Sequence, residues 1–212
     1  MLDPTGAPQP DFRVNVCRTL CMTTRTEADG SYSMSGISPE VASFYIQGDE
    51  TLSLAVPFAP VTWVDAETTT IDIRLVEMGP VETLDGSGHY GNDEIGVQFG
   101  NGDVVDFLSS DPIDTLAITS APADARPPIE VDAEVLAVYY LAPFEAHGEA
   151  TVSVREAWGM SPGETVDVWY GATPLESGFA HAGTLTVGDA GEWMDGTATI
   201  HAFTVVVVTR GA

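Results

Sequence analysis

The residues best suited to chemistry in this sequence are oxygen-bearing side chains concentrated in two glycine-containing loops. They are Asp85, Ser87, Asp93, Asn101, Asp103 and Asp106. Calcium prefers six to eight oxygen ligands from flexible loops, and these side chains supply such oxygens. Neither loop has the spacing of an EF-hand, so a calcium site and ordinary polar turns both remain open. Calcium is the one cofactor that the sequence suggests.

The histidines and serines show no arrangement typical of a hydrolase. His89, His147, His181 and His201 lie far apart, and none belongs to an HExxH, HxH or His-Cys motif. Ser161 lies in an expected turn without the G-x-S-x-G elbow. Carboxylates are so abundant that a pair of them does not by itself indicate glycosidase chemistry. We therefore predict a protein that is not an enzyme.

Tryptophans provide candidate ligand-binding residues. Trp158 and Trp193 lie near glycines in expected loops, where an exposed indole could stack on a sugar or fill a partner's pocket. The alternative is that each indole covers the end of a hydrophobic core.

Cys17 and Cys21 are separated by three residues, the length of a short hairpin loop. Such a hairpin would place them opposite each other on paired strands, at a Cβ separation slightly long for a disulfide. A disulfide is typical of an exported protein, and two reduced, buried cysteines are the alternative. A zinc site is disfavoured because no second cysteine pair or histidine accompanies them.

The charge balance excludes nucleic acid as a partner. The formal net charge is -25, and all seven basic residues are arginines scattered along the chain. So acidic a surface repels itself, and we expect salt to stabilise the fold. Salt adaptation, secretion and a calcium-loaded surface are the three interpretations of this composition.

No segment predicts a membrane span. The longest purely apolar run is Val205 to Val208, far shorter than the roughly 20 residues that a bilayer requires. No charged and then apolar leader precedes Asp3. With the cysteines, these features predict an extracellular or cell-surface protein whose signal segment is not part of the sequence.

Short runs of β-branched and alternating apolar residues recur between Gly, Pro, Asp and Ser, and helical periodicity is nearly absent. The predicted fold class is all-β, with two β-sandwich domains in tandem. The predicted strands are 13–17, 21–26, 31–35, 43–47, 52–56, 69–76, 95–99, 104–108, 115–119, 131–141, 150–155, 165–170, 181–187 and 197–209. The Met78-Gly79-Pro80 segment separates the predicted domains, residues 1–78 and 79–212.

The first predicted domain contains three short motifs: a D-x-x-G-x-P turn at Asp3, then Asp29-Gly30-Ser31-Tyr32, and Gly36-Ile37-Ser38-Pro39. Through these motifs it resembles the carboxypeptidase regulatory-like, transthyretin-like β-sandwich family. Gly30 provides the positive φ of a tight turn, and we expect Tyr32 and Met34 to face the core. The family's opening strand is missing upstream of Leu2, and Glu40 replaces the usual corner glycine. The resemblance implies a spacer or binding module and no catalytic residues.

The second predicted domain contains Pro162, Gly163, a strand ending in Trp169-Tyr170, and the later Gly178-Phe179 and Ala182-Gly183-Thr184. In these residues it is similar to immunoglobulin-like or ZU5-like sandwich modules of bacterial secreted and surface proteins. Residues alternate along 165–170, so one row should point inward and the other outward.

We predict a non-enzymatic adhesion, scaffold or assembly module with a protein or glycan partner at a surface. Three alternatives remain: a carbohydrate-binding module, accessory domains of a larger secreted hydrolase, and a surface filament. In the filament, a neighbouring copy would supply the missing strand by β-augmentation, so a homo-oligomer is one expectation.

Overall fold

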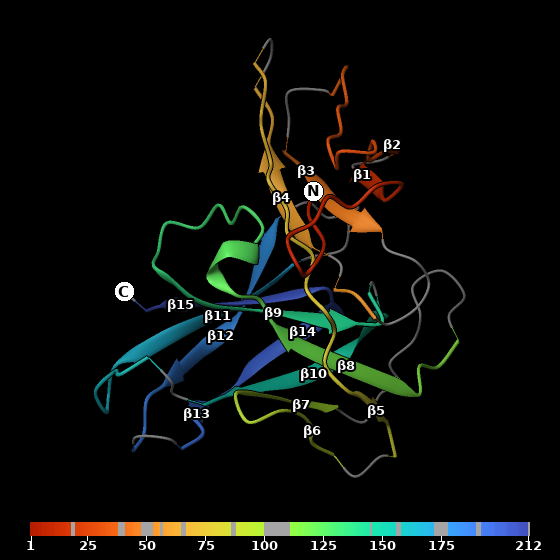
Figure 1. Cartoon of the computed structure of the whole chain (residues 1–212). Coiled ribbons are helices and arrows are strands. Elements are labelled where there is room, and N and C mark those ends of the chain that lie inside the picture. Colours follow the sequence, from red (N-terminus) through yellow and green to blue (C-terminus); the bar gives the residue numbers. More distant parts are fainter. Residues whose placement is uncertain are drawn as a thin grey trace.

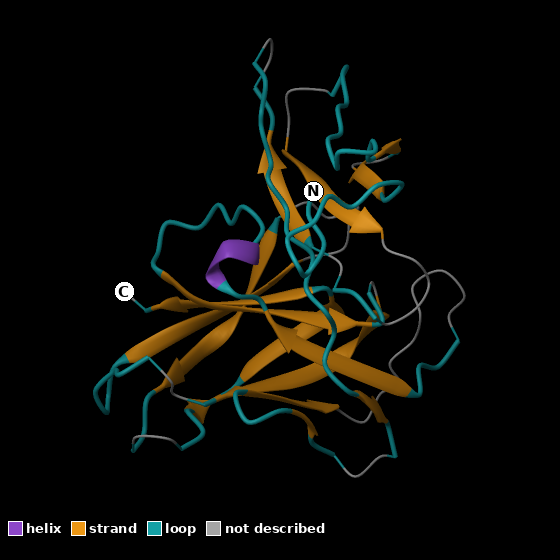
Figure 2. Cartoon of the chain, in the orientation of Figure 1, coloured by secondary structure: helices purple, strands orange, loops and turns teal. Residues whose placement is uncertain are grey.

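The computed structural model describes residues 1–17, 20–37, 41–47, 53–55, 57–64, 67–85, 88–99, 111–144, 146–155, 158–171, 178–189 and 192–211, with 41–47 described by backbone alone. Their regular structure is β-strand throughout, apart from a single 3-10 turn, η1 (Ala123–Ala125). All pairings between these strands are antiparallel (Figures 1 and 2). The all-β prediction is confirmed. Among the described residues, no helix has the length and apolar character needed to cross a membrane.

The first sheet belongs to the N-terminal part of the chain, residues 1–78. Its order is β2-β1-β3-β4, and the strands are β1 (Arg13–Cys17), β2 (Cys21–Arg25), β3 (Val41–Gln47) and β4 (Phe58–Thr62). Val14 and Val16 alternate along β1 and are both buried. The sequence analysis missed β4, which contains Pro60. An edge strand tolerates proline because one row of its backbone groups needs no strand partner.

Two further sheets form the C-terminal part, residues 79–211. One has the order β14-β10-β7-β6, with β6 (Tyr90–Gly91), β7 (Ile95–Phe99), β10 (Ala146–Val154) and β14 (Ala198–Phe203). The other has the order β13-β12-β11-β15-β9-β8-β5. Its strands are β5 (Val81–Thr83), β8 (Thr115–Ser120), β9 (Val135–Ala142), β11 (Thr165–Gly171), β12 (Phe179–Thr186), β13 (Asp195–Gly196) and β15 (Val205–Arg210). Apolar side chains from both sheets meet in one core.

A second apolar cluster joins the N-terminal part to the outer face of the larger sheet. Phe58 of β4 is 0% exposed and packs with Val138, Tyr140, Val205 and Val207. The alternate residues of β15 point into the core between the sheets, so this strand is covered on both faces. Burial on both faces explains why the Val205 to Val208 run is continuously apolar. In Figure 1, β4 rises from the sheet that contains β9 and β15.

Several predicted strands need correction. The predicted 197–209 strand is two strands in different sheets, because the chain changes sheet at Thr204, whose hydroxyl donates to the Gly171 carbonyl at 2.7 Å. Residues 31–35 and 69–76 form no strand ladder; the latter makes an isolated bridge at Arg74. Within the predicted 52–56 strand, the described residues make one isolated bridge, at Leu54. The predicted 104–108 strand lies outside the described residues.

Candidate functional site

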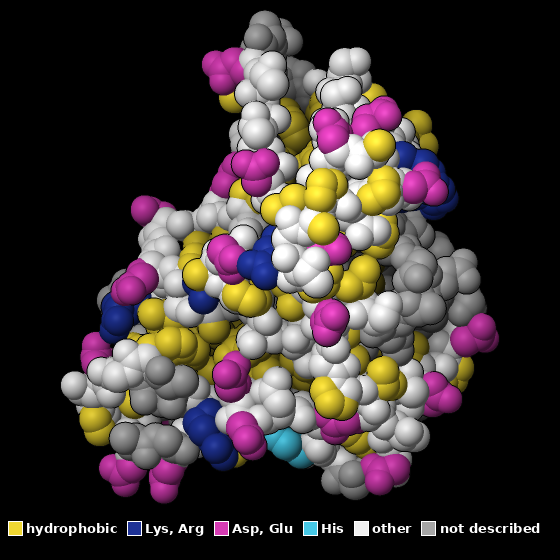
Figure 3. All heavy atoms as spheres, in the orientation of Figure 1, with side chains coloured by type: hydrophobic (Ala, Val, Ile, Leu, Met, Phe, Trp, Pro, Cys, Tyr) yellow, Lys and Arg dark blue, Asp and Glu magenta, His cyan; other side chains and the backbone are white. Residues whose placement is uncertain are grey.

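An apolar pocket of about 310 Å³ lies in the N-terminal part and is the best candidate for a binding site. Two chain segments, residues 31–37 and 68–72, supply most of its wall. Val14 and Val16 from β1 and Trp63 from the segment after β4 also line it. In Figure 3 the upper projections of the molecule stand apart, and hydrophobic side chains show between them. We call this cavity the N-terminal pocket.

A tight turn starts the first wall segment. The Gly30 backbone N–H donates to the Glu27 carbonyl, and Gly30 has a φ of 77°. A side chain at Gly30 would collide with the Met1 carbonyl, so both φ and space require glycine. After the turn, residues alternate: Tyr32 and Met34 pack against the core, and their serine neighbours are exposed. The predicted inward orientation of Tyr32 and Met34 is confirmed.

Tyr32 connects the two walls of the N-terminal pocket. Its hydroxyl donates a hydrogen bond of 2.6 Å to the Ile71 carbonyl. Burial and the nearby Asp72 carboxylate raise the pKa of Tyr32 to about 12. The phenol is therefore a neutral hydrogen-bond donor at physiological pH.

The backbone of the pocket walls is extended but belongs to no strand ladder. Neither 31–37 nor 67–73 is a strand in the described part of the chain. Pairing starts just below the pocket, where the Leu2 N–H donates to the Ile73 carbonyl and the Leu75 N–H donates to the Leu2 carbonyl. On the other side, the Met1 ammonium donates to the Gly30 carbonyl at 2.6 Å. Met1 and Leu2 thus occupy the lower end of the gap between the walls, and Met1 borders the pocket above.

Trp63 carries a buried polar atom at the N-terminal pocket. Its ring lines the pocket, and its Nε1 has no hydrogen-bond acceptor among the residues that the structure describes. A buried donor left without an acceptor costs about 1–3 kcal/mol. A ligand that brings an acceptor and shifts the ring would recover part of this cost.

A second cavity opens in the C-terminal part beside Trp158. This Trp158 cleft has a volume of about 220 Å³ and is also lined by Glu94, Arg126 and Tyr139. A polar hollow of about 480 Å³, lined by Glu82 and Asp93 among others, shares Glu94 and Ser120 with it. Burial and Glu94 raise the pKa of Tyr139, whereas Arg126 lowers it, so the Tyr139 hydroxyl lies near both charged residues at the cleft.

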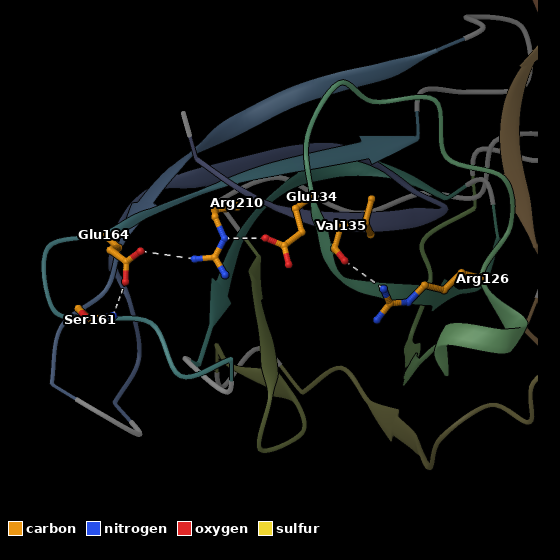
Figure 4. Close-up of polar contacts among 6 residues, drawn as sticks. All are labelled: Arg126, Glu134, Val135, Ser161, Glu164 and Arg210. Carbon is orange, nitrogen blue, oxygen red and sulfur yellow. Dashed lines mark hydrogen bonds and ion pairs between the residues drawn. The ribbon is translucent and has the colours of Figure 1, made fainter.

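Two arginines of the C-terminal part, one of them in the wall of the Trp158 cleft, make internal contacts. The Arg126 guanidinium donates to the carbonyls of Val135 at 3.1 Å and Leu136 at 3.0 Å. Arg210 of β15 lies between Glu134 at 2.7 Å and Glu164 at 3.4 Å (Figure 4). These contacts tie the ends of β15, β9 and β11 together. The carboxylates that line the neighbouring hollow, Glu82, Asp93 and Glu94, make its local charge negative.

Of the two tryptophans predicted to bind a ligand, the structure places Trp158 beside a described cavity and packs Trp193 against other side chains. The Trp193 ring lies edge-on to His89 with centroids 5.4 Å apart, and Arg155 Cζ is 5.1 Å from its centroid. Both tryptophans are half-buried.

Two of the predicted calcium ligands are described. Asp85 and Asp93 are exposed, and Asp85 accepts a hydrogen bond of 3.0 Å from the Tyr90 hydroxyl. Ser87, Asn101, Asp103 and Asp106 lie outside the described residues. Across the described ranges, no three His, Cys, Asp or Glu side chains form a group that could hold a metal ion.

The cysteines lie opposite each other in the β1–β2 register, with Cα atoms 4.0 Å apart. A disulfide joins Cys17 and Cys21, with an S–S distance of 1.99 Å. The disulfide closes the β1–β2 hairpin at the end of β1, the strand whose Val14 and Val16 line the N-terminal pocket.

Sequence reasoning missed most of the N-terminal pocket. It selected neither Trp63 nor Asp72, and it assigned both wall segments to strands. The consecutive threonines at 68–70 follow Glu67 and are exposed. Such a run of strand-forming residues without burial is a signal for an unpaired edge.

No protein-family model, curated protein or solved structure matches this chain. The resemblances to transthyretin-like and to immunoglobulin-like or ZU5-like domains therefore stay predictions.

Proposed function

We propose that this chain is a non-enzymatic adhesion, scaffold or assembly module at the cell surface. Its N-terminal part would be a transthyretin-like sandwich and its C-terminal part an immunoglobulin-like or ZU5-like sandwich. The N-terminal pocket is the single observation that carries this proposal. Its ligand would be an apolar segment of a partner protein.

The lining of the pocket suits binding better than catalysis. Its floor is aliphatic, its walls combine Tyr32, Met34 and Trp63, and Asp72 is the carboxylate among the lining residues. Aromatic and sulfur-containing side chains are typical anchors for protein partners. One carboxylate can orient a ligand, whereas acid-base hydrolysis of a glycoside needs two.

Site-specific photo-crosslinking tests this function. Benzoylphenylalanine would replace Ser33 or Thr69 in the wall segments, and Ser161 in the C-terminal part as a matched exposed control. Irradiation of cells that make the protein should give adducts with the same partner from both wall positions and not from Ser161. Mass spectrometry identifies the adduct. Equal adducts from all positions, or none from the walls, would reject the pocket as the partner site.

Binding of a neutral sugar at the Trp158 cleft is a second candidate function. The supporting observation is that an indole, the buried Tyr139 and Glu94 line one small cavity. An aromatic face with a few polar groups is typical of such sites. Retention on immobilised neutral glycans should be lost in Trp158→Ala and kept in Trp193→Ala. Unchanged retention in Trp158→Ala would rule it out.

A further inference from the structure

We propose that the Trp158 cleft and the polar hollow beside it form one site for a glycan that carries a protonated amino sugar. The ring of one sugar unit would lie against Trp158, and the ammonium group of the adjacent unit would lie among the carboxylates of the hollow. This inference rests on the second candidate function and extends it from a neutral sugar to a glycan with a cationic unit. The carrying observation is that an aromatic cleft and an acidic hollow share Glu94 and Ser120.

Three carboxylates of the described chain border the polar hollow. Glu82 belongs to β5, and Asp93 and Glu94 directly precede β7. Glu82 is half-buried, and its Oε1 accepts a hydrogen bond of 3.0 Å from the Gly91 backbone N–H. This bond orients the carboxylate, which has further lone pairs for a ligand. A hollow lined by charges of one sign concentrates ligands of the opposite sign.

A buried hydroxyl gives independent evidence for a ligand on the cleft side. Tyr139 is 2% exposed and lines the cleft, where the charges of Glu94 and Arg126 both act on its phenol. The neighbouring Tyr140 hydroxyl donates to the Ala125 carbonyl at 3.3 Å, whereas the Tyr139 hydroxyl makes no hydrogen bond within the described ranges. Buried polar groups normally have a partner, and a sugar hydroxyl at the cleft would provide one.

The arginine in the cleft wall does not convert the site to an anion site. The Arg126 guanidinium donates to the carbonyls of Val135 and Leu136, and Figure 4 shows it turned toward the first of them. Its hydrogen-bond donors are therefore used within the protein. Because carboxylates outnumber this one cation among the described lining residues, an ammonium group fits better than a uronate or a sulfated sugar.

The other lining groups favour a sugar over a simple organic cation. Trp158 offers an indole for the apolar face of a sugar ring. Thr119, Ser120 and Asn92 border the hollow with hydroxyl and amide groups. Ring hydroxyls can exchange hydrogen bonds with these groups, whereas an alkylammonium ion would leave them unpaired. An aromatic surface next to a few polar groups is typical of small-molecule sites.

Identically linked tetramers of glucose and of glucosamine test this inference with the whole chain. The two probes differ in one substituent of each ring, a hydroxyl group in glucose and an ammonium group in glucosamine. Calorimetric titration at low salt, at a pH that keeps the amine protonated, should show about tenfold tighter binding of the glucosamine tetramer. Sodium chloride should reduce this preference, because it screens the carboxylates.

Charge-removing variants locate the ammonium group. Glu82→Gln and Glu94→Gln should each lower the preference for glucosamine by about two- to fivefold and leave the affinity for the glucose tetramer unchanged. Glutamine at position 82 keeps an oxygen that can accept the Gly91 N–H. Glu27→Gln is the matched control, because it removes the same charge from an exposed position in the N-terminal part. This control should leave the preference unchanged.

Tyr139→Phe tests the cleft side of the site. The variant keeps the buried ring and removes the hydroxyl, so both tetramers should bind about three- to tenfold more weakly. The ratio of their two affinities should stay the same, because the hydroxyl faces the sugar unit that both probes share. Unchanged affinity for both tetramers would overturn the assignment of the Tyr139 hydroxyl to the site.

The outcomes separate this inference from the second candidate function. Equal affinity for the two tetramers, or a preference that Glu27→Gln lowers as much as Glu82→Gln does, would overturn the ammonium site. Binding of the glucose tetramer would then still support a neutral sugar at the Trp158 cleft. A capped lysine amide that binds as tightly as the glucosamine tetramer would overturn the assignment to a sugar. Absence of binding by both tetramers would reject both the inference and the second candidate function.

Discussion

In the C-terminal part, two sheets supply side chains to one core, and Leu185, Ile200 and Val206 are each 0–1% exposed. In the N-terminal part, one sheet is opposed by extended segments that form no ladder, and Tyr32 and Met34 are half-buried. The N-terminal part therefore leaves apolar surface available to a ligand. Phe58 and its neighbours hold the N-terminal part against the C-terminal part, whose own core is closed.

This difference shows where binding is least costly in such a molecule. A closed core would have to be opened before it could accept a partner, at the cost of broken packing. A pocket in an incomplete layer accepts a ligand without opening a closed core. The N-terminal part would thus be less stable than the C-terminal part and better able to bind a ligand.

Phe58→Ala should have the largest effect. Phe58 is 0% exposed and lies between the two parts, with its ring 6.1 Å from that of Phe144. Loss of a buried phenyl ring costs about 3–5 kcal/mol. We expect the free energy of unfolding to fall by this amount and the N-terminal part to unfold at lower urea concentration than the C-terminal part. Hydrogen exchange of β1 and β15 along the urea series measures both.

Met34→Ala is the matched control for Phe58→Ala. Met34 is half-buried in the pocket wall, so its truncation should cost about 1 kcal/mol and should not separate the two transitions. Equal costs for both variants would contradict the view that Phe58 couples the parts.

Reduction of the Cys17–Cys21 disulfide should have the next largest effect. The bond closes a very short loop, and chain entropy assigns such a loop about 2 kcal/mol. We expect exchange to accelerate in β1 and β2 and to stay unchanged in β10 and β14. The Cys17→Ala, Cys21→Ala variant should reproduce the effect without reductant. Uniform acceleration across all sheets would show that the N-terminal part does not unfold separately.

Sequence patterns predicted the strands of the closed core better than the candidate site. Residues 95–99 were predicted with the bounds of β7, and the predicted 115–119 and 165–170 each end one residue before β8 and β11, because apolar side chains of all three strands pack in the core between the two sheets. The segment 31–35 alternates just as clearly, yet it is not a strand in the described part of the chain. Alternation reports which side chains face a core and not whether the backbone is paired.

The pocket residues escaped prediction for the same reason. Trp63, Asp72 and the valines of β1 are far apart in the sequence and meet only through the register of the first sheet and the turn at Gly30. The local signals did predict that turn and the positive φ of Gly30, since both depend on neighbouring residues.

Alkaline pH should remove the stabilisation that Tyr32 provides. The pKa of Tyr32 is about 12, compared with 10.0 for the free side chain. Between these pH values the unfolded chain releases the phenolic proton and the folded chain keeps it, so the free energy of unfolding falls as pH rises. The stabilisation is fully present below pH 10 and is lost as pH passes through 12.

Thermal midpoints of the parent chain and Tyr32→Phe measure this contribution. The parent should be more stable below pH 10, because the hydroxyl donates to the Ile71 carbonyl, and the difference should vanish by about pH 12. Tyr139→Phe is the matched variant in the C-terminal part. Burial also raises the pKa of the Tyr139 phenol, so the two tyrosines can be compared over the same pH range. A Tyr32 difference that is independent of pH would contradict the raised pKa.

The smallest expected effect is the difference in thermal midpoint between calcium chloride and magnesium chloride. Sodium chloride should raise the thermal midpoint of a chain with a net charge of -25, because it screens carboxylate repulsion. Calcium and magnesium chloride at equal concentration should then give equal midpoints. The reason is that Asp85 and Asp93 are exposed and Asp85 already accepts the Tyr90 hydroxyl.

A calcium-specific rise would contradict this expectation and locate the ion in the C-terminal part, which contains all six predicted ligands. Asp85→Asn and Asp103→Asn should then each reduce the rise, and slower exchange should be confined to β6, which lies within the first loop, and β7, which separates the two loops. Slower exchange in β1 and β2 would instead indicate an ion near the N-terminal pocket. The same experiment therefore tests which of the two parts depends on a ligand for its stability.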